Sequence, residues 1–106
     1  MSRTKSTRDL TDAELEKVAG QFRLLGEPMR LKILQTVCAR SLTVGEIVAA
    51  TGATQSNISK HLSLLASAGI ITRHKDGQFV CYKAGNALTM KLCELVHQEL
   101  LEQKRG

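Results

Sequence analysis

Six polar side chains in one short stretch have the chemistry needed to read DNA. Between Thr54 and Leu65 the chain carries groups that donate or accept hydrogen bonds: Gln55, Ser56, Asn57, Ser59, Lys60 and His61. Glutamine, asparagine and lysine pair with base edges in the major groove, and hydroxyl groups suit phosphates. The stretch is a candidate nucleic-acid reader, although the same pattern also fits an ordinary solvated helix face.

An α-helix would place these polar side chains on one side. Ile58, Leu62 and Leu65 recur at helical spacing, so they would anchor the opposite face in a core. Thr54 stands at the N-cap, where its hydroxyl can accept a hydrogen bond from a free first-turn amide, and it is also a candidate DNA contact. We expect the helix to stop at Gly69, which can take a left-handed conformation.

The segment before this helix predicts a helix-turn-helix. Thr43 and Glu46 have the spacing of a capping box, which opens a short helix with Ile47 and Val48. Residues 51–53, with Gly52 at their centre, form the expected turn. A short helix, a tight glycine turn and a longer polar-faced helix make up the helix-turn-helix arrangement.

The segment after this helix predicts a β-hairpin. Residues 70–75 and 78–83 are strand-like and flank Asp76 and Gly77, a two-residue turn signal. Side chains near the tip complete the candidate interface: Arg73, His74, Lys75 and Gln78. A basic tip suits a wing that lies along a phosphate backbone.

Charge and composition agree with this interpretation. The 106-residue chain has a formal net charge of +5, and no acidic residue occurs between Glu46 and Asp76. A one-signed gap around a polar helix favours a polyanionic partner. Aromatic residues make up only 3% of the chain and tryptophan is absent, so the core must be aliphatic and the fold mostly helical.

The remaining segments complete the predicted architecture. Residues 1–8 form a basic tail expected to be disordered, and residues 9–104 form one domain. Thr11 and Glu14 make a capping box for a first helix, Pro28 suits the start of a second, and Asn86 caps a last helix running to Gln103. That last helix is apolar on most sides, which predicts a second subunit. The order is therefore α-α-α-α-β-β-α, in a homodimer.

Two segments resemble the ArsR/SmtB family of winged-helix repressors. Residues 25–34, with Glu27, Pro28, Arg30 and Leu31, are similar to its second-helix signature, and residues 55–69 are similar to its recognition helix. The resemblance implies a homodimer joined through its first and last helices. It also implies a palindromic double-stranded DNA operator, and release by an inducer.

The identity of the inducer depends on cysteine chemistry. Some members of the family bridge one cysteine in the second helix and one in the last, and this chain has Cys38 and Cys93 on those helices, in shifted positions. Cys93 and His97, four residues apart, share a helix face and could bind a soft metal or metalloid ion. Alternatively, these thiols are core filler and no inducer acts on them.

Other classes of function follow less well from the sequence. No apolar run approaches the length of a membrane span, no signal peptide begins the chain, and an odd number of cysteines favours the cytoplasm. No glycine-rich phosphate loop or nucleophile–base set predicts an enzyme. Two alternatives stay open: a DNA-binding regulator without metal or thiol sensing, and a winged helix that binds another protein.

Overall fold

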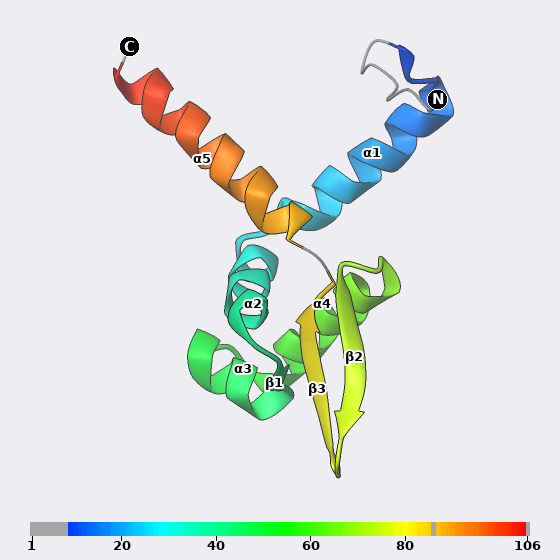
Figure 1. Ribbon diagram of the computed structural model, residues 1–106, viewed down its shortest axis with the longest axis vertical. Helices are drawn as coiled ribbons and strands as arrows, with labels where there is room; N and C mark the ends of the chain where they lie inside the picture. Colours follow the sequence, from blue (N-terminus) through cyan, green and yellow to red (C-terminus); the bar gives the residue numbers. More distant parts are fainter. Residues whose placement is uncertain (1–8, 86, 106) are drawn as a thin grey trace.

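The computed structural model describes residues 9–85 and 87–105. Its elements are, in order, α1 (Asp12–Leu25), α2 (Pro28–Ala39), β1 (Leu42–Thr43), α3 (Val44–Thr51), α4 (Gln55–Ser67), β2 (Ile71–Asp76), β3 (Phe79–Ala84) and α5 (Leu88–Arg105). Helices α2, α3 and α4 and the sheet form a body, from which α1 and α5 diverge as two arms (Figure 1). The predicted order of helices and hairpin strands is confirmed. The predicted tail and the cap at Asn86 lie outside the described residues.

The helices begin where side chains satisfy free backbone amides. Thr11 and Glu14 form a complete capping box at α1, with hydrogen bonds of 3.1 and 2.9 Å. Thr43 and Glu46 form another at α3, with bonds of 3.2 and 2.9 Å. Pro28 occupies the first turn of α2, where a missing N–H has no cost. These local predictions are confirmed.

Helix α4 ends through a left-handed glycine. Gly69 has a φ of 75°, which lets the chain turn back without a side-chain clash. The amide of Ile70 donates to the carbonyl of Leu65, and that of Gly69 to the carbonyl of Ala66, both at 3.0 Å. This is the Schellman pattern, and it brings Ile70 onto the core. The predicted stop is confirmed.

The sheet has three antiparallel strands in the order β1-β3-β2. β2 and β3 form the hairpin, while β1 adds Leu42 opposite Tyr82 and Thr43 opposite Cys81. β1 was not predicted from the sequence, because two residues are too short for an alternating pattern. Its effect is to tie the start of α3 to the middle of β3.

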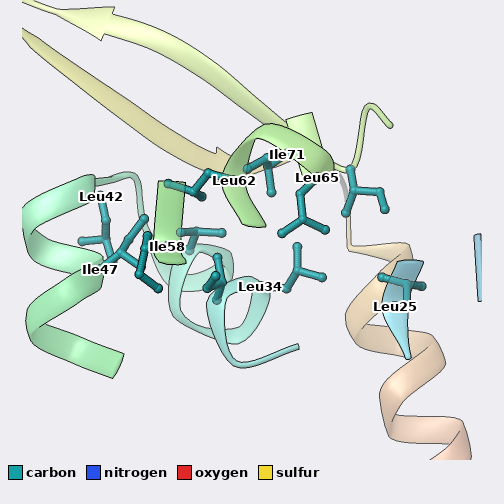
Figure 2. Close-up of a cluster of buried hydrophobic side chains, with 11 residues drawn as sticks. Leu25, Leu34, Leu42, Ile47, Ile58, Leu62, Leu65 and Ile71 are labelled. Carbon is teal, nitrogen blue, oxygen red and sulfur yellow. The ribbon is translucent and has the colours of Figure 1, made fainter. Parts of the chain in front are cut away.

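The core is aliphatic and lies between α2, α3, α4 and the base of the sheet (Figure 2). Ile33, Leu34 and Val37 come from α2, and Ile47 from α3. Ile58, Leu62 and Leu65 come from α4 and are at most 1% exposed. Leu42, Ile70 and Ile71 close the core on the sheet side, and Leu25 on the side of α1. The body fixes α4 from behind.

The two arms carry apolar side chains that nothing in a single chain covers. On α1 the exposed residues are Leu15, Val18 and Phe22. On α5 they are Leu88, Leu95, Val96, Leu100 and Leu101, and no described residue of α5 is fully buried. Large exposed apolar surfaces of this kind mark protein–protein contacts.

Candidate nucleic-acid interface

Helix α4 presents a polar face because its apolar face is completely buried. Thr54 caps the helix with extended backbone, and its hydroxyl accepts a hydrogen bond from the amide of Asn57 at 3.2 Å. The buried positions of Ile58, Leu62 and Leu65 fix which side points outward. The exposed polar residues are Gln55, Ser56, Asn57, Ser59 and Lys60.

The outer face of α4 is longer than the sequence analysis predicted. A shallow open depression on this face is lined by Gln55, Ser56, Ser59, Lys60, Ser63 and Leu64. Residues four apart lie one above the other on a helix, so Gln55, Ser59 and Ser63 form one row. Ser56, Lys60 and Leu64 form the next. Ser63 and Leu64 were missed, and the four-residue spacing from Gln55 and Ser56 is the signal that finds them.

A tight turn sets α4 at an angle to α3. Gly52 ends α3 with a φ of 76°, and its amide donates to the carbonyl of Val48 at 2.8 Å. Buried Thr51 supports the turn, because its hydroxyl donates to the carbonyl of Ile47 and accepts from the amide of Ala53. The turn residues are 52–54, one residue later than predicted, because α3 continues through Thr51.

The hairpin register differs from the prediction by one residue. Asp76 pairs with Phe79, so the two-residue turn is Gly77 and Gln78 rather than Asp76 and Gly77. Gly77 has a φ of 65°, and no described non-glycine residue has a positive φ. Glycine alone at the first turn position is typical of a type II′ turn. Pairing of Ile71 with Ala84 at the packed base sets this register.

The hairpin exposes all four predicted candidates: Arg73, His74, Lys75 and Gln78. The side chains of Arg73 and Lys75 lie two positions apart on one strand and therefore share a face. Phe79 is 57% exposed beside the tip, which the sequence analysis did not single out. The hairpin reaches away from the body on the side opposite the arms, so its basic residues are free to meet a partner (Figure 1).

His61 does not lie on the outer face, where it was predicted to lie with the other five polar candidates. Its side chain is only 12% exposed and packs against the start of α2. The Nδ1 atom accepts a hydrogen bond from Nε of Arg30 at 3.1 Å, and Nε2 lies 3.7 Å from Oε2 of Glu27. These two partners at the start of α2 turn the imidazole inward, away from the exposed polar side of α4.

The carboxylate of Glu27 lies beside His61 and Arg30, and its pKa is lowered. Partial loss of solvent raises its pKa, but hydrogen bonds from the amides of Met29 and Arg30 lower it, as do the charges of His61 and Arg30. The lowering effects prevail, so the pKa of Glu27 lies below its ordinary value. The carboxylate also caps α2, accepting from the amide of Arg30 at 3.0 Å.

The three cysteines occupy separate environments. Cys38 is exposed near the end of α2 and lines a small pocket with Arg40 and Lys83. Cys81 is buried on β3. Cys93 is partly buried and lines a groove between α2 and α5 together with His97 and Gln35. The structure therefore brings Cys93 and His97 to one groove and places Cys38 in a different pocket.

These donors do not complete a metal site within one chain. Among residues 9–85 and 87–105, no three His, Cys, Asp or Glu side chains are placed to hold an ion together. Cys93 and His97 are two donors, whereas tetrahedral zinc requires four ligands. As for membranes, the described helices include none with the length and apolar character of a bilayer span.

A polar helix presented after a tight turn, with a basic hairpin beside it, defines a winged helix-turn-helix module of the DNA-binding class. Residues 27–73 match the model of the bacterial regulatory proteins of the arsR family. The chain is also 34% identical over 61 residues to the transcriptional repressor SdpR of Bacillus subtilis, covering 58% of this chain and 68% of that protein. It belongs to the ArsR family, whose members are DNA-binding transcriptional regulators and not enzymes.

Two further comparisons extend the likeness to most of the chain. A probable mercury resistance operon repressor of Streptomyces lividans is 32% identical over 81 residues, which cover 76% of this chain but only 65% of that protein. A solution structure of a homodimeric winged helix-turn-helix DNA-binding domain from Mycobacterium bovis, a possible ArsR-family regulator, superimposes with a TM-score of 0.74. That structure is 27% identical and covers 95% of this chain and 92% of its own.

Proposed function

We propose that the protein represses transcription by binding a palindromic operator as a homodimer. Helix α4 enters the major groove and the β2–β3 hairpin follows the phosphate backbone. The observation that carries this proposal is the division of α4 into two faces. Ile58, Leu62 and Leu65 are wholly buried, while the opposite face offers hydrogen-bonding side chains to a partner.

The side chains of the interface divide into two roles. Gln55, Asn57 and Lys60 have the length and the donors to reach base edges, so they provide sequence selectivity. Phosphate contacts come from hydroxyl, amide and basic groups: Thr54, Ser56, Ser59, Arg73, His74, Lys75 and Gln78. His61 takes neither role, because Arg30 and Glu27 hold it on the inner side.

The homodimer is supported by the uncovered arms. Phe22 on α1 and Val96 on α5 are each 57% exposed, and both line an apolar groove where α1, α2 and α5 meet. A second copy supplies the same apolar surface in return, since a two-fold contact uses one patch twice. The two copies of α4 then face successive major grooves, about 34 Å apart along the duplex.

Selection of duplexes from a random pool by the wild-type protein tests this proposal. We expect an enriched motif of two inverted half-sites with centres about 10 base pairs apart. Binding to this selected duplex should weaken steeply with salt. A single-sided motif would contradict the dimeric operator. Weak, salt-insensitive binding without enrichment would favour a winged helix that binds another protein.

We further propose that an inducer acts on Cys93. This thiol lies with His97 in the groove between α2 and α5, and both residues also line the apolar groove with Phe22 and Val96. A group added to the Cys93 sulfur would therefore press on the surface proposed to pair the two subunits. Cys38 is more exposed, but its pocket lies against Arg40 and Lys83, away from that groove.

Thiol-reactive compounds test the role of Cys93. An organic tetrasulfide or a soft metal ion should lower the affinity of the reduced protein for the selected duplex. Cys93→Ser should abolish that response, and Cys38→Ser should leave it intact. A response lost only in Cys38→Ser would move the site to α2. Unchanged affinity under every treatment would identify a regulator without thiol chemistry.

A further inference from the structure

One hydrogen-bonded cluster joins segments of the chain that are far apart in sequence. Nε of Arg30, in the first turn of α2, donates to Nδ1 of His61 on α4 at 3.1 Å, across 31 residues. Nε of arginine always carries its proton, so Nδ1 of His61 is the acceptor in this bond. The bond therefore specifies the orientation of the ring.

The same guanidinium also binds the end of α1. A terminal nitrogen of Arg30 donates to the carbonyl of Leu24 at 2.9 Å, in the last turn of α1. Arg30 is half-buried, and Glu27 beside it accepts from its amide and faces His61. One side chain thus connects the arm α1 to the helix that presents the polar face.

This connection adds a directional restraint to the core contacts of α4. The packing of Ile58, Leu62 and Leu65 selects the buried face of the helix, but the hydrophobic effect itself is non-directional. A hydrogen bond depends on angle and distance, so it restrains rotation of the helix about its axis. A helix with side chains has a radius of about 5–6 Å, and a rotation of about 10° moves the outer groups by about 1 Å. That displacement is enough to break a base contact.

We infer that Arg30 is a positioning residue for DNA recognition: it ties the last turn of α1 to His61 and so fixes the orientation of α4. The inference rests on the proposed function of α4 as the DNA reader. As a consequence, Arg30 on α2 and His61 on α4 contribute to DNA recognition together, through the bond between them. The α1 arm and the reading helix are then linked through a single guanidinium group.

Four variants test the bridge, each titrated with the selected duplex and with a random duplex of equal length. Arg30→Ala and His61→Leu should each bind the selected duplex about tenfold more weakly. The random duplex should be affected less, so the ratio of the two affinities falls. Arg30→Lys keeps the charge but not the two-pronged donor, so its ratio should also fall. His61→Asn keeps an acceptor near the position of Nδ1 and should restore most of the ratio.

The double variant Arg30→Ala/His61→Leu gives the sharpest result. If the two side chains act through one bond, the double variant should bind no more weakly than the poorer single variant. Losses that multiply would overturn the inference. Circular dichroism and sedimentation check that each variant is folded and dimeric. If Arg30→Ala does not fold, His61→Leu decides, because it leaves the Glu27–Arg30 turn in place. An unchanged affinity ratio in a folded His61→Leu dimer would refute the positioning role.

Gln55→Ala separates the failure of this inference from the failure of the proposed function. A lowered affinity ratio in Gln55→Ala, with wild-type ratios in Arg30→Ala and His61→Leu, would leave α4 as the reader and remove only the positioning role. A wild-type ratio in Gln55→Ala and in Lys60→Ala would instead contradict the proposed reading face itself.

Discussion

Helices α4 and α5 have similar apolar content but leave opposite kinds of surface exposed. α4 (Gln55–Ser67) buries Ile58, Leu62 and Leu65 completely and presents hydroxyl, amide and ammonium groups to water. α5 (Leu88–Arg105) instead leaves Leu95 67% exposed and Leu100 55% exposed. Polar groups on a fully anchored helix suit a polyanion, whereas an apolar face without cover suits another protein surface. The type of surface left exposed therefore indicates the type of partner.

The contrast also separates apolar burial within one chain from apolar burial between two copies of the chain. The core residues of the body are covered within one chain, whereas the exposed apolar residues of the arms are not. The arms would gain about 25 cal/mol for each Å² of apolar surface that a second copy covers. Substitutions in α4 and in the arms should therefore affect different measurements.

The largest effect is expected inside α4, from two neighbouring leucines. Leu65 is 0% exposed and Leu64 is 46% exposed. Leu65→Ala should lower the free energy of unfolding by about 2–5 kcal/mol, because it leaves a cavity in the core. Leu64→Ala should change it by no more than about 0.5 kcal/mol. Denaturant unfolding followed by circular dichroism measures both, and equal losses would contradict the two-faced description of α4.

The next effect separates the arms from the body. Phe22→Glu puts a charge on the exposed apolar face of α1, and the matched Gln21→Glu puts the same charge on its exposed polar neighbour. Phe22→Glu should weaken dimerisation by at least about 30-fold, equivalent to about 2 kcal/mol. Sedimentation equilibrium gives the dissociation constants. A Phe22→Glu protein as dimeric as Gln21→Glu would show that α1 lies outside the interface.

Substitutions at Gln55 and Lys75 should affect DNA binding in two different ways. Gln55→Ala should cost about 1–3 kcal/mol on the selected duplex and little on a random one, since it removes a base contact. Lys75→Ala should weaken both duplexes alike and make the dependence on salt less steep, since it removes a phosphate contact. Fluorescence anisotropy at several salt concentrations measures both effects. Equal losses on the two duplexes for Gln55→Ala would contradict its role in selectivity.

The smallest effect concerns the start of α3, the helix that precedes α4. A hydrogen bond from the amide of Thr43 lowers the pKa of Glu46, whereas partial loss of solvent raises it. A hydrogen bond with the hydroxyl of Thr43 and the charge of Arg40 lower this pKa further. Because the pKa is lowered in the folded state, ionised Glu46 stabilises the fold at pH values above its ordinary pKa of 4.5. This stabilisation is lost as the pH falls through the folded-state pKa.

Glu46→Gln provides the test, because glutamine keeps a capping acceptor but does not titrate. The variant should melt at a slightly lower temperature than the wild type at about pH 7, and the difference should shrink at about pH 3. Thermal unfolding at both pH values gives the comparison. A difference that grows as the pH falls would contradict a lowered folded-state pKa for Glu46.

Local features of the fold could be predicted from the sequence because their causes are local. A threonine three residues before a glutamate predicted the starts of α1 and α3, and Gly69 predicted the end of α4. The hairpin was also predicted, but its turn was not placed correctly. Gly77 serves equally well as the first or the second turn residue, and the choice is made by the packing of Ile71 and Ala84 at the other end of the strands.

The candidate site was predictable to the extent that helical spacing defines it. The inward positions of Ile58, Leu62 and Leu65 were sufficient to place Gln55, Ser59 and Lys60 outside. His61 was misplaced because it sits at the boundary of the two faces, where a partner 31 residues away in the chain decides its direction. The DNA contacts themselves stay predictions.

Helices α1 and α5 contribute little to the core, and this affects how much of the protein a cell must synthesise. Pairing of arms is second order in protein, so under the proposed dimer the amount of binding species varies with the square of free monomer when monomer predominates. Halving the concentration of monomer would then lower the concentration of dimer to about a quarter. The uncovered leucines of α5 would make gene control respond steeply to the dosage of its regulator.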